Sequence, residues 1–126
     1  MIQKDNNLFL SFCTLEIVVP VVSLSNQTIQ EKNTNSTILT CVISSGYPTP
    51  NITWYKDDKK LILLALRSAD DCRINGFHYM EKHRLPFARH LVICKPSHTE
   101  NTGVYKCEAK NSKGNSSSEA FLNVLG

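Results

Sequence analysis

The side chains best suited to chemistry gather around residues 72–94. Cys72 and Cys94 bound this stretch, and His78, His83 and His90 lie inside it. Thiolates and imidazoles are zinc ligands, whereas two thiols in an oxidising compartment tend to form a disulfide. The spacing resembles no compact zinc module, so we expect no metal site. A Cys72–Cys94 bridge and two unpaired thiols remain open as alternatives.

Positive charge is concentrated in the same third of the chain. The basic side chains there are Arg67, Arg73, Lys82, His83, Arg84, Arg89, His90 and Lys95. Clustered Lys and Arg can bind sulfated glycans, mainly by displacing counterions, and Lys82, Arg84 and Arg89 are the candidate residues for such a site. Asp70, Asp71 and Glu81 dilute this charge, which favours an ordinary solvated face.

Composition and motifs exclude several classes of function. The chain has 126 residues, 41% of them hydrophobic, which is enough for one domain with a core. A net charge of +3 gives no electrostatic case for nucleic-acid binding. The sequence has no Gly-rich phosphate loop, no Gly-x-Ser-x-Gly and no His-Glu-x-x-His. We therefore expect neither catalysis nor a cofactor.

The strongest pattern involves a cysteine, a tryptophan and a Tyr-x-Cys sequence. Cys41 ends the β-branched stretch at 36–41, and alternation along it predicts Leu39, Cys41 and Ile43 on one buried face. Trp54 follows Cys41 by 13 residues, and Tyr105-Lys106-Cys107 comes far downstream. Turn residues 46–50, Gly-Tyr-Pro-Thr-Pro, precede the tryptophan, and Gly103 precedes the tyrosine.

This constellation resembles the immunoglobulin superfamily, in its I-set or C2 variant. The resemblance implies an all-β fold, an antiparallel sandwich of two sheets with one inter-sheet disulfide. It implies that Cys41 and Cys107 form that bridge, that Trp54 packs against it and that Tyr105 bonds back to the preceding turn. Leu39, Trp54 and Tyr105 are then core residues with no chemistry of their own.

One position departs from the family pattern. Asn101 stands where similar domains usually carry an aspartate, so a charge-assisted bond is lost there. Residues 46–57 are similar to immunoglobulin domains of growth-factor receptors, and the segment after Asp57 is similar to relatives of the interleukin-1 receptor. These motifs imply receptor or cell-adhesion ectodomains as a class and specify no ligand.

Glycosylation sequons bear on the compartment. Asn-x-Ser/Thr sequences begin at Asn26, Asn35, Asn51 and Asn115, each near an expected turn or strand end. Four sequons favour an extracellular or cell-surface protein and predict these four asparagines as glycosylation sites. Five cysteines leave one over after two bridges, and Cys13 is the expected odd thiol.

We expect two regions, an N-terminal tail at 1–19 and an immunoglobulin-like domain at 20–126. The tail only partly resembles a signal peptide, because Glu16 interrupts its apolar run, and a gene-model fragment is the alternative. It is short and charged for a membrane span, so any membrane attachment needs an anchor that this sequence does not contain.

Strands are expected at 20–25 with a continuation at 28–30, 36–44, 51–56, 72–74, 77–80, 90–94, 104–110 and 119–124. Residues 56–60 should form a polar hairpin, and Asn75-Gly76 a tight turn between the strands at 72–74 and 77–80. Residues 61–66 are apolar without alternation. Their leucines, Leu61, Leu63, Leu64 and Leu66, are the candidate contact surface for a neighbouring domain or partner.

Two functions follow from these observations. The favoured one is an extracellular protein-recognition module of a receptor or adhesion molecule, which binds a protein ligand or a neighbouring immunoglobulin domain. The alternative is an intracellular structural module of a muscle or cytoskeletal protein, in which Cys41 and Cys107 stay reduced.

Overall fold

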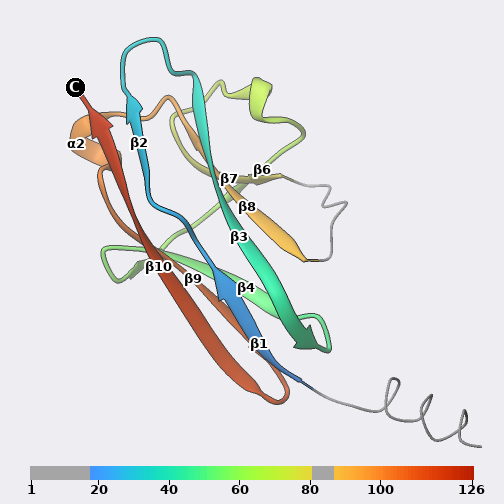
Figure 1. The fold of residues 1–126 in the computed structure, drawn as a ribbon. Coiled ribbons are helices and arrows are strands. Elements are labelled where there is room, and N and C mark those ends of the chain that lie inside the picture. The colour runs from blue at the N-terminus through green and yellow to red at the C-terminus, as the bar shows by residue number, and fades with distance from the viewer. Residues whose placement is uncertain (1–17, 81–86) are drawn as a thin grey trace, which may run out of the picture.

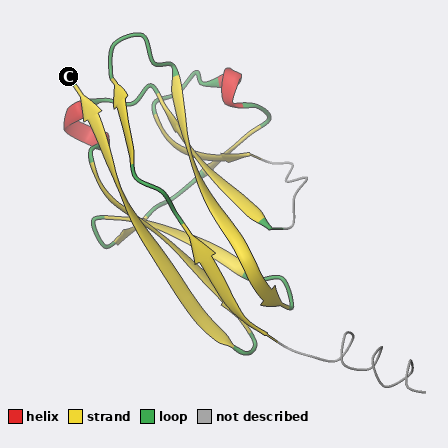
Figure 2. Ribbon diagram, in the orientation of Figure 1, coloured by secondary structure: helices red, strands yellow, loops and turns green. Residues whose placement is uncertain are grey.

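The chain folds as a sandwich of two β-sheets, which a computed structural model describes for residues 18–80 and 87–126. Figure 1 shows the layers face to face, with the start of β1 at one end of the molecule and the C-terminus at the other. Strands dominate, and two short helical turns lie at the end of the molecule that also holds the C-terminus (Figure 2). The predicted tail at 1–19 lies almost wholly outside the described residues.

The first sheet has the strand order β1-β3-β8-β7-β6. Its strands are β1 (Val18–Ser23), β3 (Ser36–Tyr47), β8 (Ala88–Cys94), β7 (Gly76–Met80) and β6 (Leu64–Leu66). Neighbours in this sheet are antiparallel except β6, which pairs with β7 in parallel. The sheet begins at Val18, slightly before the predicted Pro20.

The second sheet has the order β2-β10-β9-β4-β5. Its strands are β2 (Gln27–Gln30), β10 (Gly114–Leu125), β9 (Gly103–Asn111), β4 (Asn51–Lys56) and β5 (Lys59–Lys60). Only the β2–β10 pair is parallel. The all-β sandwich predicted from the sequence is confirmed, with a short parallel pair at one edge of each sheet.

The core between the sheets is organised around the bond between Cys41 on β3 and Cys107 on β9. Both cysteines are fully buried, and the exposed fraction of Trp54 is 4%. Trp54 pairs directly with Cys107 across the β4–β9 ladder, so the indole and the bridge belong to one apolar cluster. Leu39 is buried in the same cluster because strand alternation sends it to the same face as Cys41.

Tyr105 fixes the start of β9 from inside the sandwich. Its hydroxyl donates to the carbonyl oxygen of Asn101 at 2.6 Å, and burial raises the pKa of this hydroxyl. Asn101 ends the helical turn α2 (His98–Asn101), which Ser97 caps by accepting from the backbone N–H of Glu100. The amide oxygen of Asn101 accepts from the Ser97 backbone N–H at 2.7 Å, so the neutral side chain at this unusual position is still hydrogen-bonded.

Asp57 and Asp58 form the predicted hairpin between β4 and β5, and both adopt positive φ angles. The Asp57 carboxylate turns back and accepts from the Val104 backbone N–H at 2.9 Å. A Cβ atom on Gly103 would lie 2.7 Å from this carboxylate. Glycine at 103 therefore leaves the space that the Asp57 side chain occupies.

A second, smaller core lies on the outer face of the first sheet. Leu91 and Ile93 belong to the central cluster, and Val92 and Cys94 belong to the other, because neighbouring strand residues point to opposite faces. The segment between β6 and β7, which includes the 3-10 turn η1 (Ala69–Asp71), covers this outer face. Cys72 at its end is bonded to Cys94 with a Cα–Cα distance of 5.2 Å. The described residues thus contain two disulfides, of which Cys41–Cys107 joins the sheets.

Two sequence expectations are wrong. Residues 72–74 are not a strand, and Gly76 opens β7 instead of turning a hairpin, because β7 pairs with β6 and β8. The expected continuation of the first strand at 28–30 is present as β2, which joins the other sheet beside β10. The Asn26 side chain accepts from the Phe121 backbone N–H at 2.8 Å where the chain changes sheets.

Replacing Trp54 by alanine should lower the free energy of unfolding by about 3–5 kcal/mol, because a cavity would replace the buried indole. Denaturant unfolding measures this change. Ile62→Ala, at a side chain with an exposed fraction of 88%, is the matched control and should change stability very little. Equal effects of the two substitutions would contradict the burial of Trp54 in the core.

Replacing both Cys72 and Cys94 by alanine should lower the free energy of unfolding by about 3 kcal/mol, the chain-entropy value for a loop of this length. Amide hydrogen exchange in residues 67–75 should accelerate, since nothing covalent would then hold this segment to the sheet. Exchange in the buried part of β9 should stay slow. Unchanged protection of residues 67–75 would show that apolar contacts alone hold the segment.

Candidate interaction surface

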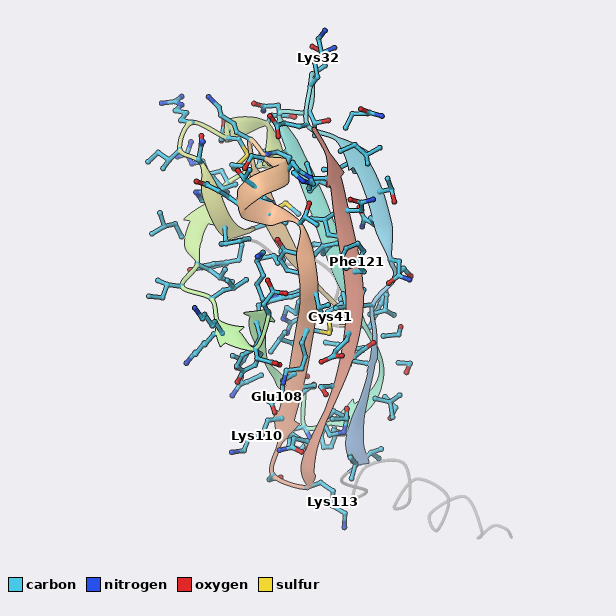
Figure 3. All side chains as sticks on the ribbon, turned by 90° about the vertical axis from the view of Figure 1, so that its left-hand side faces the viewer. Lys32, Cys41, Glu108, Lys110, Lys113 and Phe121 are labelled. Atoms are coloured by element: carbon cyan, nitrogen blue, oxygen red, sulfur yellow. A yellow bond between two sulfur atoms is a disulfide. The ribbon has the colours of Figure 1, made fainter. Side chains whose placement is uncertain are left out.

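The outward side chains of β4, β9 and β10 form a continuous sheet face, here called the β4–β9–β10 face. The ladder registers place these side chains in transverse rows. The rows are Asn51, Lys110 and Asn115; Thr53, Glu108 and Ser117; Tyr55, Lys106 and Glu119; and the pair Val104 and Phe121. Figure 3 looks onto β9 and β10, with Lys110 near one end and Phe121 further toward the other.

Direct contacts order the centre of this face. The Tyr55 hydroxyl donates to Glu108 Oε1 at 3.1 Å, and this hydrogen bond is the main reason that the pKa of Tyr55 is raised. Lys106 Nζ lies 4.6 Å from the centroid of the Tyr55 ring, within the range of a cation–π contact. Two strands, β4 and β9, thus contribute to one fixed polar cluster in the middle of the face.

An open hollow of about 350 Å³ lies beside this cluster, lined by Asp57, Asp58, Val104, Lys106 and Glu119. Lys56 Nζ lies 2.9 Å from Asp57 Oδ2, and this contact, with the Val104 N–H, lowers the pKa of Asp57. The Asp57 carboxylate is therefore charged and held in place. The side chains of Val104 and Phe121 have exposed fractions of 41% and 45%, and they add apolar area next to the hollow.

The predicted leucine surface is mostly covered. Leu61 and Leu63 pack against the central core, and Leu66 packs against the smaller cluster. Leu64 is exposed on the edge strand β6, and its neighbour Ile62 is exposed by 88%. Three of the four leucines are thus partly buried against the cores, and Ile62, Leu64 and Ala65 are exposed here.

The basic cluster is only partly within the described chain. Lys82 and Arg84 lie outside the described residues, so the sulfated-glycan site stays a prediction. Arg89 lies on β8, where its Nη1 donates to the Ala88 carbonyl oxygen at 2.9 Å. His90 Nδ1 lies 3.0 Å from the Thr40 hydroxyl, and partial burial lowers the pKa of this histidine.

The cysteines and histidines do not assemble a ligand set in the described chain. Cys72 and Cys94 are bonded to each other, and His78 is buried with its Nδ1 3.2 Å from the Gly76 carbonyl oxygen. Within residues 18–80 and 87–126, no group of three or more His, Cys, Asp or Glu side chains could hold a metal ion. His83 and Cys13 lie outside the described residues.

The four sequon asparagines, Asn26, Asn35, Asn51 and Asn115, are all exposed. Asn26 lies between β1 and β2, and Asn35 lies just before β3. Asn51 and Asn115 lie on either side of Lys110 in one row of the β4–β9–β10 face. Sequence reasoning found each asparagine but missed this shared row, because the row depends on the register between three strands.

No helix in the described parts of the chain has the length and apolar character required to cross a membrane.

Comparisons with known proteins agree with this architecture. The chain is 33% identical to the muscle M-line assembly protein unc-89 of Caenorhabditis elegans over 88 residues. This match covers 68% of the chain and 1% of unc-89. Hemicentin-2 of Mus musculus is 34% identical over 113 residues, 87% of this chain and 2% of that protein. The chain therefore corresponds to a very small part of these relatives.

Among solved structures, the titin M3 domain superposes with a TM-score of 0.65 and 27% sequence identity, over 85% of this chain and 97% of that domain. Residues 19–111 match the family of immunoglobulin domains. Because that match spans most of the sandwich, including Cys41, Trp54 and Cys107, the chain belongs to the immunoglobulin-domain family.

Proposed function

We propose that this chain is a non-catalytic, extracellular protein-recognition module of a cell-surface receptor or adhesion molecule. The β4–β9–β10 face is the surface that we assign to the protein partner, in place of the leucines at 61–66. Its fixed polar centre and adjoining apolar pair, Val104 and Phe121, give the mixture of rigid polar and apolar contacts typical of recognition surfaces.

The observation that carries this proposal is the Cys72–Cys94 bridge. This second bridge does not join the two sheets, since it attaches the segment at 67–75 to the outer face of one of them. Disulfides form and persist in oxidising compartments and are rare in the cytosol. Four exposed sequon asparagines point in the same direction, because N-glycans are added to surface positions of secreted chains.

The alternative function is a structural module inside muscle or cytoskeletal proteins. It is favoured by the likeness to the M-line protein unc-89 and to the titin M3 domain. In that setting, we expect all four cysteines to remain thiols and the sandwich to act as a spacer.

Protein isolated from its native source should distinguish the two functions. If the proposal holds, Cys41, Cys72, Cys94 and Cys107 will resist alkylation in denaturant until a reductant is added, because buried thiols become reachable only in the unfolded chain. Peptide-N-glycosidase treatment will also lower the mass of the untreated protein. Mass spectrometry of the alkylated and deglycosylated samples measures both results.

A fully reduced and denatured sample is the control for alkylation, since all its cysteines should react. Free thiols in the native protein, together with no mass change after glycosidase treatment, would contradict the extracellular proposal and support the muscle-type module.

A further inference from the structure

One end of the β4–β9–β10 face carries two sequons in a single row. Asn51 on β4 and Asn115 on β10 each pair with Lys110 on the intervening strand β9. Adjacent strands lie about 4.8 Å apart, so the two asparagines are separated by roughly 10 Å across the sheet. All three side chains are exposed and point to the same side of the sheet.

Both asparagines lie where their amides can be reached. Asn51 is the first residue of β4, after Pro50, and Asn115 is the second residue of β10, after the turn at 112–113. In the described part of the chain, neither side chain has a hydrogen-bond partner. Asn26 differs, because its side-chain oxygen accepts from the Phe121 N–H.

We propose that Asn51 and Asn115 both carry N-glycans, and that this pair of glycans shields the Lys110 end of the β4–β9–β10 face. The centre of the face, with Tyr55, and the opposite end, with Val104 and Phe121, are then the parts left open to a protein partner. This inference rests on the proposed extracellular function, and it adds a restriction on where a partner can bind.

The modification requires an activated sugar donor, a lipid diphosphate-linked oligosaccharide, and the host transferase. The amide Nδ2 of asparagine forms a bond to the anomeric carbon of the first sugar and loses one proton to the transferase. The bond between that carbon and the phosphate oxygen breaks, and the lipid diphosphate leaves. No oxidation or reduction occurs in this exchange.

The shielding follows from size and position. An N-glycan is bulky and hydrated, and two of them spaced roughly 10 Å apart overlap above the residue between them. Lys110 is that residue. Lys60 on β5 lies in the row of Tyr55, two rows away from Lys110, and so lies outside the shielded end. Lys110 and Lys60 are both exposed and therefore report separately on the shielded end and on the open part of the face.

The test uses the full chain, secreted from a glycosylating eukaryotic host with a supplied signal sequence. Glycopeptide mass spectrometry measures occupancy at each asparagine, and an amine-reactive ester measures the acylation rate of each lysine. We expect both Asn51 and Asn115 to be occupied. Lys110 should react several-fold more slowly than in the Asn51→Gln, Asn115→Gln double variant, while the rate at Lys60 stays the same.

The matched control is the Asn26→Gln, Asn35→Gln double variant, which removes the other two glycans and should leave Lys110 protected. Thr53→Ala with Ser117→Ala destroys the same two sequons while keeping both asparagines. This variant should raise the acylation rate of Lys110 to the same extent as the Asn51→Gln, Asn115→Gln variant. If the substitutions at Asn51 and Asn115, or those at Thr53 and Ser117, impair folding, the folded glycoprotein can be treated with an endoglycosidase that leaves one sugar on each asparagine. The Lys110 rate before and after this treatment then gives the comparison with and without the glycans.

An unoccupied Asn51 or Asn115 in the secreted protein would overturn the inference, as would equal Lys110 rates with and without the two glycans. Because the signal sequence is supplied, neither result bears on where the native protein resides. Conversely, free thiols in the native protein would contradict the extracellular function even if both asparagines can be glycosylated in this host.

Discussion

The sandwich is centred on the Cys41–Cys107 disulfide, which links its two sheets and belongs to the same buried cluster as the indole of Trp54. Cys41 and Cys107 come from strands in different sheets, and Trp54 stands beside Cys107 on the adjoining strand. The bond fixes how the sheets face each other, and the indole fills the space next to it, so the two act together. The outer faces can vary in sequence because this centre holds the layers in position.

The smaller core gives the first sheet a partial third layer. A strand residue that points away from the main core ordinarily meets water, yet Val92 and Cys94 are fully buried. They are buried because the segment between β6 and β7 crosses over them and is bonded to the sheet through Cys72. Part of one face of the sandwich is thus covered by the chain itself, while the β4–β9–β10 face remains accessible.

Alternation around Cys41 predicted Leu39, Cys41 and Ile43 on one buried face, and the immunoglobulin resemblance implied the core positions of Trp54 and Tyr105. The crossing segment could not be predicted in the same way. Asn75-Gly76 has the composition of a hairpin turn, but contacts of Cys72 and Leu66 with the outer face of β8 decide its path. The change of sheet near Asn26 depends on Phe121, 95 residues further along, which no local pattern contains.

The candidate face shows the same limit. Each of its residues was visible in the sequence, but the pairing of β9 with β10 within the rows follows from where the β9–β10 turn begins. That position is set by Asn111, whose side-chain oxygen accepts from the backbone N–H groups of Lys113 and Gly114. A turn shifted by one residue would bring Asn115 to the inner face.

The parallel pair of β2 and β10 affects how the domain responds to tension. Gln27–Gln30 lies beside Leu122–Leu125 in the same direction, and the two ends of the described sandwich lie at opposite ends of the molecule. A force that pulls these ends apart slides the two strands past each other, so their hydrogen bonds are strained together and not opened one after another. This geometry favours mechanical resistance of the sandwich along its long axis.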